Sequence, residues 1–363
     1  MAHANFGTIR PSLAAIAPEI AGPRPVLVTG ASGFIGGRLT RRLIEHGHLV
    51  FCLQRAGSHT EELRTTGARI LAGDVTDAAS VQRALGESQA TTVFHLAGLV
   101  RARFPGDFMR ANAMGVETVA ASCSRCTSPP VLTLVSSLAA AGPSSAGMPR
   151  TECDDPVPMS SYGRSKLAGE KAAARHAGVV PTTIVRPPVV FGPGDRALLE
   201  VFRPVARWSV HGVPGWRGGD RRFSLVHVDD LVEGLILAAA SGERLQARGP
   251  PGQGVYFMSG DERPTYADLG LAIAVALGRK PPTIIRVPGP VLRLLGIGGD
   301  LVSRLRGRAC WINSDKMAEA LAAGSWTCSS VKAREQLGWS PAPLALADRL
   351  LETAIWYRQA GWL

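Results

Sequence analysis

The chain has 363 residues, of which 45% are hydrophobic and 19% charged, a composition typical of a globular protein with one large or two modest domains. Its longest apolar runs are far shorter than the roughly 20 residues of a membrane-spanning helix. The net charge of +11 comes from arginines scattered along the chain, without a basic run or interleaved aromatic residues, so the sequence argues against nucleic-acid binding.

The first 24 residues and the cysteines bear on the targeting of the protein and on the redox state of its compartment. Residues 1–24 contain proline and glycine breaks and lack the apolar core of a secretory signal, so we expect a disordered tail, with an organelle transit segment as the alternative. Cys123 and Cys126 form a single C-x-x-C without the second pair that a zinc site needs, and we interpret them as inert thiols. We expect no metal and a reducing, cytoplasmic compartment.

Short apolar β runs alternate with segments of helical spacing between residues 25 and 190. This alternation predicts β-α-β units, and therefore a doubly wound parallel sheet of six or more strands whose ligand site lies beyond the carboxyl ends, where the strand order reverses. The predicted strands span residues 25–30, 48–54, 68–74, 91–98, 131–137 and 182–188. The predicted helices follow the first strand, cover about 77–86 and about 108–126, and run from residue 160 to about 177.

The pattern changes after residue 190, where glycine, proline and arginine become frequent. We therefore predict two parts: an α/β dinucleotide-binding Rossmann domain over residues 25–190, and a smaller, mostly helical C-terminal substrate cap over residues 191–363. Within the second part, residues 224–260 hold a helical pattern and the strand-like "GVYFMSG", and we expect this segment to return to the sheet.

A glycine-rich turn, "VTGASGFIGGRL", joins the first strand to the first helix. Gly30, Gly33 and Gly36 are spaced three apart, and a turn this tight favours residues without a β-carbon. The backbone can then approach a pyrophosphate closely, and the helix N-terminus offers it free N–H groups and a partial positive charge. Because the turn follows an apolar strand, it predicts dinucleotide binding.

The end of the second strand bears on the choice of dinucleotide. An acid there binds the ribose 2′-hydroxyl of NAD, whereas an arginine suits the 2′-phosphate of NADP. Gln54 and Arg55 occupy this place without an acid nearby, so NADP is favoured and NAD stays open; Arg38 and Arg41 on the first helix could add positive charge. After the third strand, Asp74 could accept from the adenine amino group while Val75 packs on the ring.

The segment "SSYGRSK" places a tyrosine and a lysine on one face of a helix. Tyr162 and Lys166 are four residues apart, so their side chains point the same way. A nearby ammonium favours the phenolate, and we therefore expect Lys166 to lower the pKa of Tyr162 into the range of general acid–base catalysis. Ser137 ends the fifth strand at the same edge of the sheet, and its hydroxyl could orient a carbonyl or alcohol oxygen.

These motifs together resemble the extended short-chain dehydrogenase/reductase family, from about residue 25 to 357. The glycine turn matches its T-G-x-x-G-x-x-G loop, "YGRSK" its Tyr-x-x-x-Lys motif, "ANAMGVET" its N-x-x-G-T helix, and "RPPVVFGPGD" its R-P-x-x-x-x-G-P-G-D segment. The resemblance implies that Asn112 braces the site through its backbone or a water, and that the backbone near Pro187 meets the nicotinamide carboxamide. The catalytic candidates are thus Ser137, Tyr162, Lys166 and Asn112. The cofactor-binding candidates are Thr29, Gly30, Ser32, Gly33, Phe34, Ile35, Gly36, Arg55, Asp74, Val75, Leu96, Ala97, Gly98, Tyr162, Lys166, Pro187 and Val189.

The family resemblance leaves three functions open. The first is an NAD(P)-dependent oxidoreductase that moves a hydride between the nicotinamide and a secondary alcohol or ketone. The second is a nucleotide-sugar epimerase with tightly bound NAD, and the third is a dinucleotide-binding module without turnover. Leu138 and Ala139 follow Ser137 where dehydratases of the family carry acids, so dehydration is not expected.

The C-terminal part resembles dihydroflavonol-reductase-like and 3β-hydroxysteroid-dehydrogenase-like members, which implies an apolar or amphipathic alcohol or ketone as substrate. Arg221 and Arg222 could instead hold a diphosphate, or lie solvated beside a strand. We expect the apolar stretch at 289–305, with arginines at 293, 304, 306 and 308, to pack in the cap, with weak contact to a membrane surface as the alternative. A homodimer through helices that flank the sheet also stays open.

Overall fold

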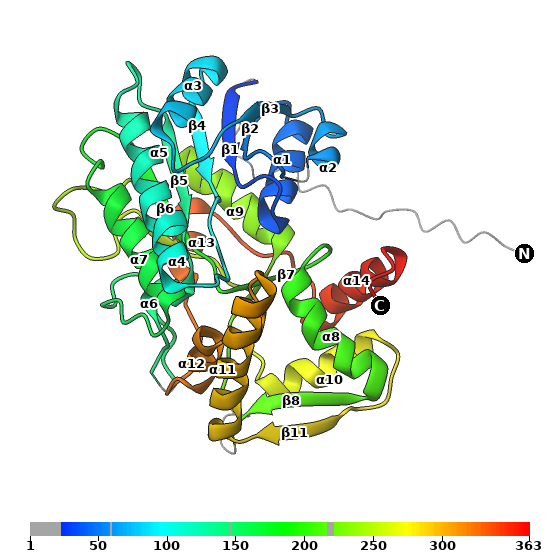
Figure 1. Ribbon diagram of the computed structural model, residues 1–363. Helices are drawn as coiled ribbons and strands as arrows, with labels where there is room; N and C mark the ends of the chain where they lie inside the picture. The colour runs from blue at the N-terminus through cyan, green and yellow to red at the C-terminus, as the bar shows by residue number, and fades with distance from the viewer. Residues whose placement is uncertain (1–22, 59, 146, 216–220) are drawn as a thin grey trace, which may run out of the picture.

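The computed structural model describes residues 23–58, 60–145, 147–215 and 221–363 (Figure 1). The tail expected for residues 1–24 lies outside the described residues, apart from Pro23 and Arg24. None of the described helices is long and apolar enough to cross a membrane.

A seven-stranded, entirely parallel sheet forms the centre of the fold and confirms the predicted doubly wound architecture. Its strand order is β10-β6-β5-β4-β1-β2-β3, so the direction of winding reverses between β1 and β4. In such sheets the ligand site lies in the crevice beyond the carboxyl ends of the two strands at the reversal. The strands are β1 (Pro25–Thr29), β2 (Leu49–Gln54), β3 (Arg69–Ala72), β4 (Thr92–His95), β5 (Val131–Val135), β6 (Thr182–Arg186) and β10 (Val255–Phe257).

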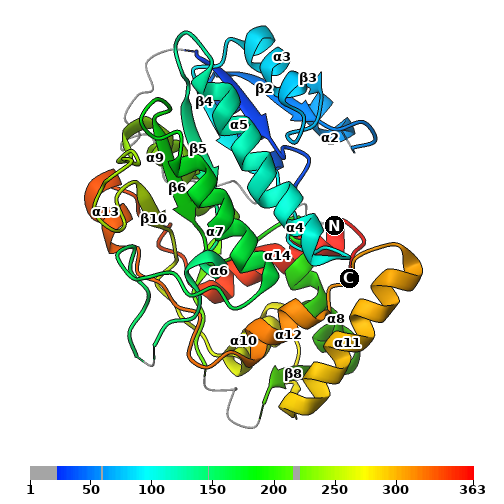
Figure 2. The same ribbon diagram turned by 60° about the vertical axis from the view of Figure 1, so that its left-hand side comes forward.

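Helices cover both faces of this sheet (Figures 1 and 2). Alternate residues of β1 show why: Val26 and Val28 enter a core shared with α1, α9 and α13, whereas Leu27 enters a second core under α3 and α5. The helices of this part are α1 (Phe34–Glu45), α2 (Glu61–Arg64), α3 (Ala78–Ser88), α4 (Pro105–Met109), α5 (Gly115–Ser124), α6 (Leu138–Ala141), α7 (Ser161–Ala174), α9 (Val228–Ser241) and α13 (Val331–Leu337).

The helix predicted over residues 108–126 is broken in the structure. A π-helical turn, η1 (Arg110–Met114), separates α4 from α5 and contains Asn112. Gly169 of α7 packs so closely on this turn that a β-carbon there would lie 2.3 Å from the backbone oxygen of Asn112. The turn therefore places Asn112 directly against the helix that carries Tyr162.

The remaining elements form a second lobe with its own core. Phe202 and Val205 of α8, Ile273 of α10 and Leu350 and Tyr357 of α14 are among its buried residues. Two small parallel pairs, β7 with β9 and β8 with β11, lie outside the large sheet. The elements are β7 (Val189–Phe191), α8 (Arg196–Trp208), β8 (Val210–Pro214), β9 (Leu225–His227), α10 (Tyr266–Ala276), β11 (Thr283–Val287), α11 (Gly289–Arg306), α12 (Ser314–Leu321) and α14 (Leu346–Gln359).

Candidate active site

The glycine turn after β1 is pressed against its surroundings on two sides. Gly30 has a φ of +74°, and a β-carbon on it would lie 2.6 Å from the backbone nitrogen of Ala97, at the end of β4. A β-carbon on Gly36 would lie 2.2 Å from the carbonyl oxygen of Gly30. Both positions therefore exclude side chains, as the sequence predicts for a close backbone approach.

The first turn of α1 has the features of an anion site. Its N-cap residue is Gly33, and no side chain caps the free N–H groups, while Ser32 and Gly33 are exposed. Phe34 and Ile35 follow in the first turn, half-buried. Uncapped N–H groups at a helix start bind phosphate readily, so these residues fit a dinucleotide pyrophosphate.

Hydrogen bonds join the ends of β1 and β4 where the winding reverses. The Thr29 hydroxyl lies 2.8 Å from His95 Nδ1 and also accepts from the backbone N–H of Ala97. Burial lowers the pKa of His95 to about 3, and the charge of Lys166 adds to this shift, so the imidazole is neutral. The pair fixes the segment that holds Leu96, Ala97 and Gly98 beside the glycine turn.

Ser137 and Tyr162 meet at the carboxyl end of β5. Ser137 is the N-cap of α6, where its hydroxyl accepts from the N–H of Ala139. The same hydroxyl lies close enough to the Tyr162 phenol to lower the pKa of that phenol. The N–H of Leu138 donates to the carbonyl of Pro187 at 2.9 Å, which places the segment after β6 next to Ser137. The structure thus brings together the predicted candidates Ser137, Tyr162 and Pro187. Val189, another candidate, lies at the start of β7 and is exposed.

Lys166 lies one turn after Tyr162 on α7, and its ammonium donates to the carbonyl of Val135 at 2.6 Å. Burial lowers the pKa of Lys166 to about 8, against the opposing charge of Glu170. Glu170 itself forms a buried ion pair with Arg186, N–O 2.6 Å, at the end of β6. This pair ties α7 to the sheet directly behind the lysine.

Asn112 holds the loop that follows β4. Its amide accepts from the N–H of Leu99 at 2.7 Å and donates to the carbonyl of Leu99 and to the Ser165 hydroxyl, both at 2.9 Å. A β-carbon on Gly98 would lie 2.6 Å from Asn112 Oδ1 and 3.9 Å from Lys166 Nζ. We expected Asn112 to act through its backbone or a water; here its side chain makes the contacts and braces the loop beside Lys166.

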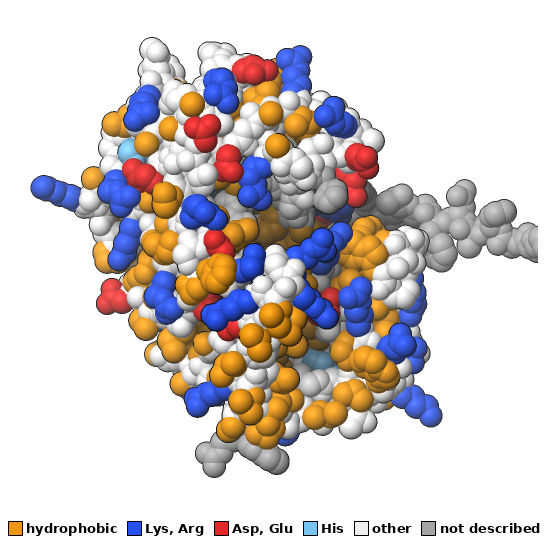
Figure 3. Space-filling view, in the orientation of Figure 1, with side chains coloured by type: hydrophobic (Ala, Val, Ile, Leu, Met, Phe, Trp, Pro, Cys, Tyr) orange, Lys and Arg blue, Asp and Glu red, His pale blue; other side chains and the backbone are white. Residues whose placement is uncertain are grey.

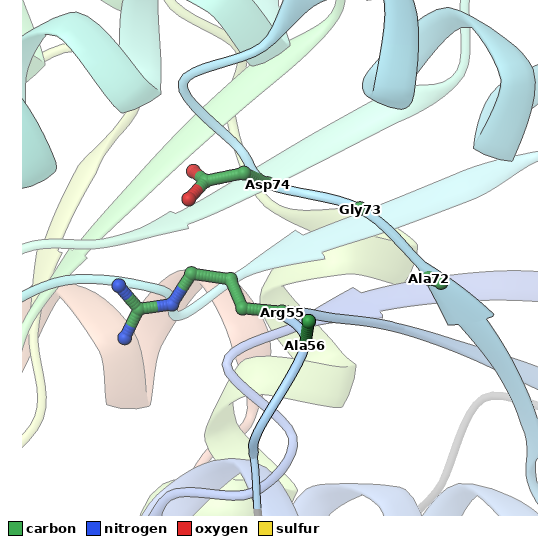
Figure 4. A pocket seen from close by; sticks show the side chains of 5 residues that line it. All are labelled: Arg55, Ala56, Ala72, Gly73 and Asp74. Carbon is green, nitrogen blue, oxygen red and sulfur yellow. The ribbon is translucent and has the colours of Figure 1, made fainter.

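A separate pocket of about 490 Å³ opens at the ends of β2 and β3, lined by Arg55, Ala56, Ala72, Gly73 and Asp74. Arg55 and Asp74 point into the same space from neighbouring strands (Figure 4). The carboxylate of Asp74 accepts from the N–H and the hydroxyl of Thr76, each at 2.8 Å, and Val75 packs near Gly115. Arg55 is exposed, so its guanidinium is accessible to a phosphate.

Three other arginines singled out by the sequence are engaged elsewhere. Arg38 forms a two-point ion pair with Asp229 of α9, so its charge is already matched. Arg221 donates to the carbonyl of Ala320, and Arg222 donates to the carbonyl of Arg263. The diphosphate-holding role considered for Arg221 and Arg222 gains no support from these contacts.

Sequence reasoning missed the contribution of α12 to the tyrosine. Asp315 accepts from the backbone N–H groups of Ser161 and Tyr162 at 3.1 and 3.0 Å, and therefore caps the start of α7. The ammonium of Lys316 lies 5.3 Å from the centroid of the Tyr162 ring and pairs with Glu319 at 2.8 Å. The side chain of Phe108 packs on the same ring.

The electrostatics of Tyr162 differ from the expectation. Burial raises the pKa of its phenol above the ordinary value, and the charge of Lys316 and the Ser137 hydroxyl oppose that rise. We expected Lys166 to supply the opposing charge; the structure places a second ammonium, Lys316, in that role. No local sequence signal marks this residue, because it belongs to a helix far along the chain.

Known proteins share both the sequence pattern and the fold. Residues 26–249 match the model of the NAD dependent epimerase/dehydratase family. The chain is 31% identical to a ceramide reductase of Caulobacter vibrioides over 93% of its own length and 96% of the relative's. It is 27% identical to a 3β-hydroxysteroid dehydrogenase/Δ5→4-isomerase of Mycobacterium tuberculosis, over 87% of this chain and 86% of that one.

A solved structure gives the same result for the fold. MoeE5 in complex with UDP-glucuronic acid and NAD superposes with a TM-score of 0.69 at 25% identity, over 92% of this chain and 99% of that chain. The resemblance to extended short-chain dehydrogenases/reductases is confirmed by these matches. This chain belongs to the NAD-dependent epimerase/dehydratase family and is an enzyme.

Proposed function

We propose that this enzyme transfers a hydride between NADP(H) and a secondary alcohol or ketone, with Tyr162 as the proton donor and acceptor. The observation that carries the proposal is the placement of the Ser137 hydroxyl beside the Tyr162 phenol, with Lys166 one turn away, near the point where the winding of the sheet reverses. Two relatives are named for the oxidation or reduction of hydroxyl and carbonyl groups, which supports the same reaction class.

Each side chain has a distinct task in ketone reduction. The nicotinamide, when bound, supplies the hydride to the carbonyl carbon. Ser137 and Tyr162 donate hydrogen bonds to the carbonyl oxygen, and the Tyr162 proton moves to that oxygen as negative charge develops on it. The ammonium groups of Lys166 and Lys316 favour the phenolate that remains. Alcohol oxidation runs the same steps in reverse.

The cofactor end of the proposal rests on the glycine turn and the pocket at Arg55. The uncapped start of α1 would hold the pyrophosphate, and Arg55 would face the 2′-phosphate of NADP at the end of β2. No acid stands at this place to bind the 2′-hydroxyl of NAD. Asp74 would accept from the adenine amino group on the other side of the pocket.

We propose an apolar or amphipathic ketone as the substrate. One relative is named for ceramide and another for a hydroxysteroid, both of which are lipids. Arg221 and Arg222 are bound to carbonyl oxygens of the second lobe, so they are poorly placed to hold the diphosphate of a nucleotide sugar. Phe108 contributes an apolar wall beside Tyr162.

The test is turnover by the Tyr162→Phe variant against a panel of apolar ketones. We expect the rate of NADPH oxidation, followed by its absorbance, to fall at least about a hundredfold, because general acid catalysis contributes that much or more. NADPH affinity, measured by fluorescence titration, should stay close to that of the unmodified protein.

The matched control is Tyr256→Phe, which removes a hydroxyl bonded to Gln336 in the sheet core. This variant should melt at a lower temperature but retain turnover. Retained activity in Tyr162→Phe would overturn the assignment. Interconversion of nucleotide sugars with no net consumption of reduced cofactor would replace the oxidoreductase by the epimerase alternative.

A further inference from the structure

One face of α11 is an exposed apolar stripe. Its residues recur at the three- and four-residue spacing that aligns side chains on one side of a helix. Leu294 and Leu305 are 68% and 78% exposed, the largest fractions in the set. The stripe consists of Val291, Leu294, Leu295, Gly298, Leu301, Val302 and Leu305. We call this set the α11 stripe; Figure 3 shows hydrophobic side chains gathered over α11 in the lower part of the view.

Arginines flank the stripe. Arg293, Arg304 and Arg306 lie on α11 and Arg308 follows it directly, and all four side chains are exposed. The only acid in the helix is Asp300, which is half-buried and accepts from the N–H of Ser314. The exposed side of α11 is therefore both apolar and positively charged, which is the pattern of a helix that lies in the interface of an anionic bilayer.

The opposite side of α11 is fixed to α12. A β-carbon on Gly299 would lie 1.9 Å from the carbonyl oxygen of Ile312, and one on Gly296 would lie 3.0 Å from Ser314, so the two helices pack at close range. The expected packing of this stretch in the cap is thus found for one face only. Because α12 carries Asp315 and Lys316, the helix with the exposed stripe is one helix away from Tyr162 (Figure 2).

The loop after β4 extends the same surface. Arg103 donates to the carbonyl of Arg304, and the guanidinium of Arg101 lies 4.0 Å from the centroid of the Trp311 ring. Val100 and Phe104 of this loop are 53% and 47% exposed. Within this loop Gly98 lies beside Lys166 and Asn112 holds Leu99, so an apolar and basic surface runs from the candidate site to α11.

We propose that the α11 stripe and its arginines dock the enzyme on a membrane surface that carries anionic lipid headgroups. The leucines and valines enter the headgroup–acyl boundary, and the arginines contact the phosphates around it. Docking in this orientation brings the loop after β4 to the bilayer, where an amphipathic ketone could pass toward Tyr162. Only this last point rests on the proposed function; the membrane contact does not.

The experiment is sedimentation with vesicles in the absence of cofactor and substrate. We expect the protein to bind vesicles of phosphatidylcholine and phosphatidylglycerol in a ratio of about two to one, and to bind pure phosphatidylcholine much more weakly. Added salt should weaken the first interaction, because it screens the arginines. The double variant Leu294→Gln/Leu305→Gln should lower the vesicle affinity about tenfold or more.

The matched control is Val179→Gln/Val331→Gln, which removes two apolar side chains of similar exposure, 57% and 54%, outside α11 and its loop. This variant should bind vesicles as the unmodified protein does. The NADPH affinity of both variants is measured in solution without vesicles. An affinity equal to that of the unmodified protein shows that the variant is folded, independently of membrane docking. Failure of the unmodified protein to bind anionic vesicles would overturn the proposal, as would a Leu294/Leu305 variant that binds normally. A stripe variant that instead converts a dimer into a monomer would assign this face to a second copy of the chain.

Discussion

The choice between NADP and NAD depends on one side chain, Arg55, in the pocket at the ends of β2 and β3. Arg55 is exposed and faces the pocket, while the carboxylate of Asp74 is already bound to Thr76. A 2′-phosphate would pair with the guanidinium, and a bare 2′-hydroxyl would leave it without a partner. The proposed preference for NADP rests on this charge.

Arg55→Asp should reverse the cofactor preference. We expect kcat/KM for NADPH to fall by about tenfold or more, because an attractive charge becomes a repulsive one, and kcat/KM for NADH to rise. The ratio of the two constants, measured with one ketone, is the readout. Arg125→Asp makes the same charge change at an exposed site at the end of α5 and should leave the ratio unchanged. An unaltered ratio in Arg55→Asp would show that the phosphate is bound elsewhere.

The charge of Lys316 should have a measurable effect on the pH dependence of catalysis. It opposes the rise that burial gives to the pKa of the Tyr162 phenol. Alcohol oxidation needs the phenolate, so its rate climbs with pH until the phenol has lost its proton. Lys316→Met removes the opposing charge, raises the phenol pKa further, and should move the midpoint of the pH–rate profile to higher pH.

The control for this prediction is Lys171→Met, which removes an exposed lysine from the same helix as Tyr162. Its profile should coincide with that of the unmodified enzyme. Because Lys316→Met leaves Glu319 without its ion-pair partner, the double variant Lys316→Met/Glu319→Gln should be measured as well. A profile that stays in place in both variants would remove Lys316 from the proton-transfer step.

Some residues of the candidate site could be predicted from the sequence because they lie close together on a single helix or turn. Tyr162 and Lys166 are neighbours on any helix, and Gly30 with Gly36 form one strand-to-helix turn. The contact between the Lys316 ammonium and the Tyr162 ring has no such local basis. It depends on how α12 packs against α7, and that packing is decided by contacts between distant segments.

At the scale of elements, the strands of the large sheet could be predicted because most of them are short, largely apolar runs buried on both faces. The edge strand β3 is the exception, since it is only partly buried. The π turn η1 within the predicted helix could not be predicted, since "ANAM" has ordinary helical character and carries no local signal for a π turn. The pairs β7–β9 and β8–β11 were also not predicted. Their strands are only three or five residues long, and β7, β8 and β11 lie among glycine and proline residues.

The two lobes meet through α12 at the scale of the whole molecule. This helix has no fully buried residue, and polar contacts join it to the start of α7. Asp315 caps the backbone of Ser161 and Tyr162, and Glu319 accepts from the Ser160 hydroxyl at 2.6 Å. Ser160 in turn accepts from the N–H of Gly163. The N–H groups of Ser161 and Tyr162 are therefore bound by α12 directly, and that of Gly163 by a serine that α12 holds.

Asp315→Ala should therefore affect catalysis as well as stability. Loss of the cap should cost about 1 kcal/mol of unfolding free energy, and it should lower kcat because Tyr162 loses the bond that fixes its backbone. Asp77→Ala is the matched control: its carboxylate caps α3 through the N–H groups of Ala79 and Ser80, both at 3.1 Å, within one segment. Urea unfolding should show similar losses in the two variants, whereas the fall in kcat should be confined to Asp315→Ala. NADPH affinity should stay unchanged in both, since the glycine turn contacts neither cap.

If the two variants keep the same kcat, the junction between the lobes supports the fold alone, and the tyrosine is positioned by α7 and Ser137 without help from the second lobe.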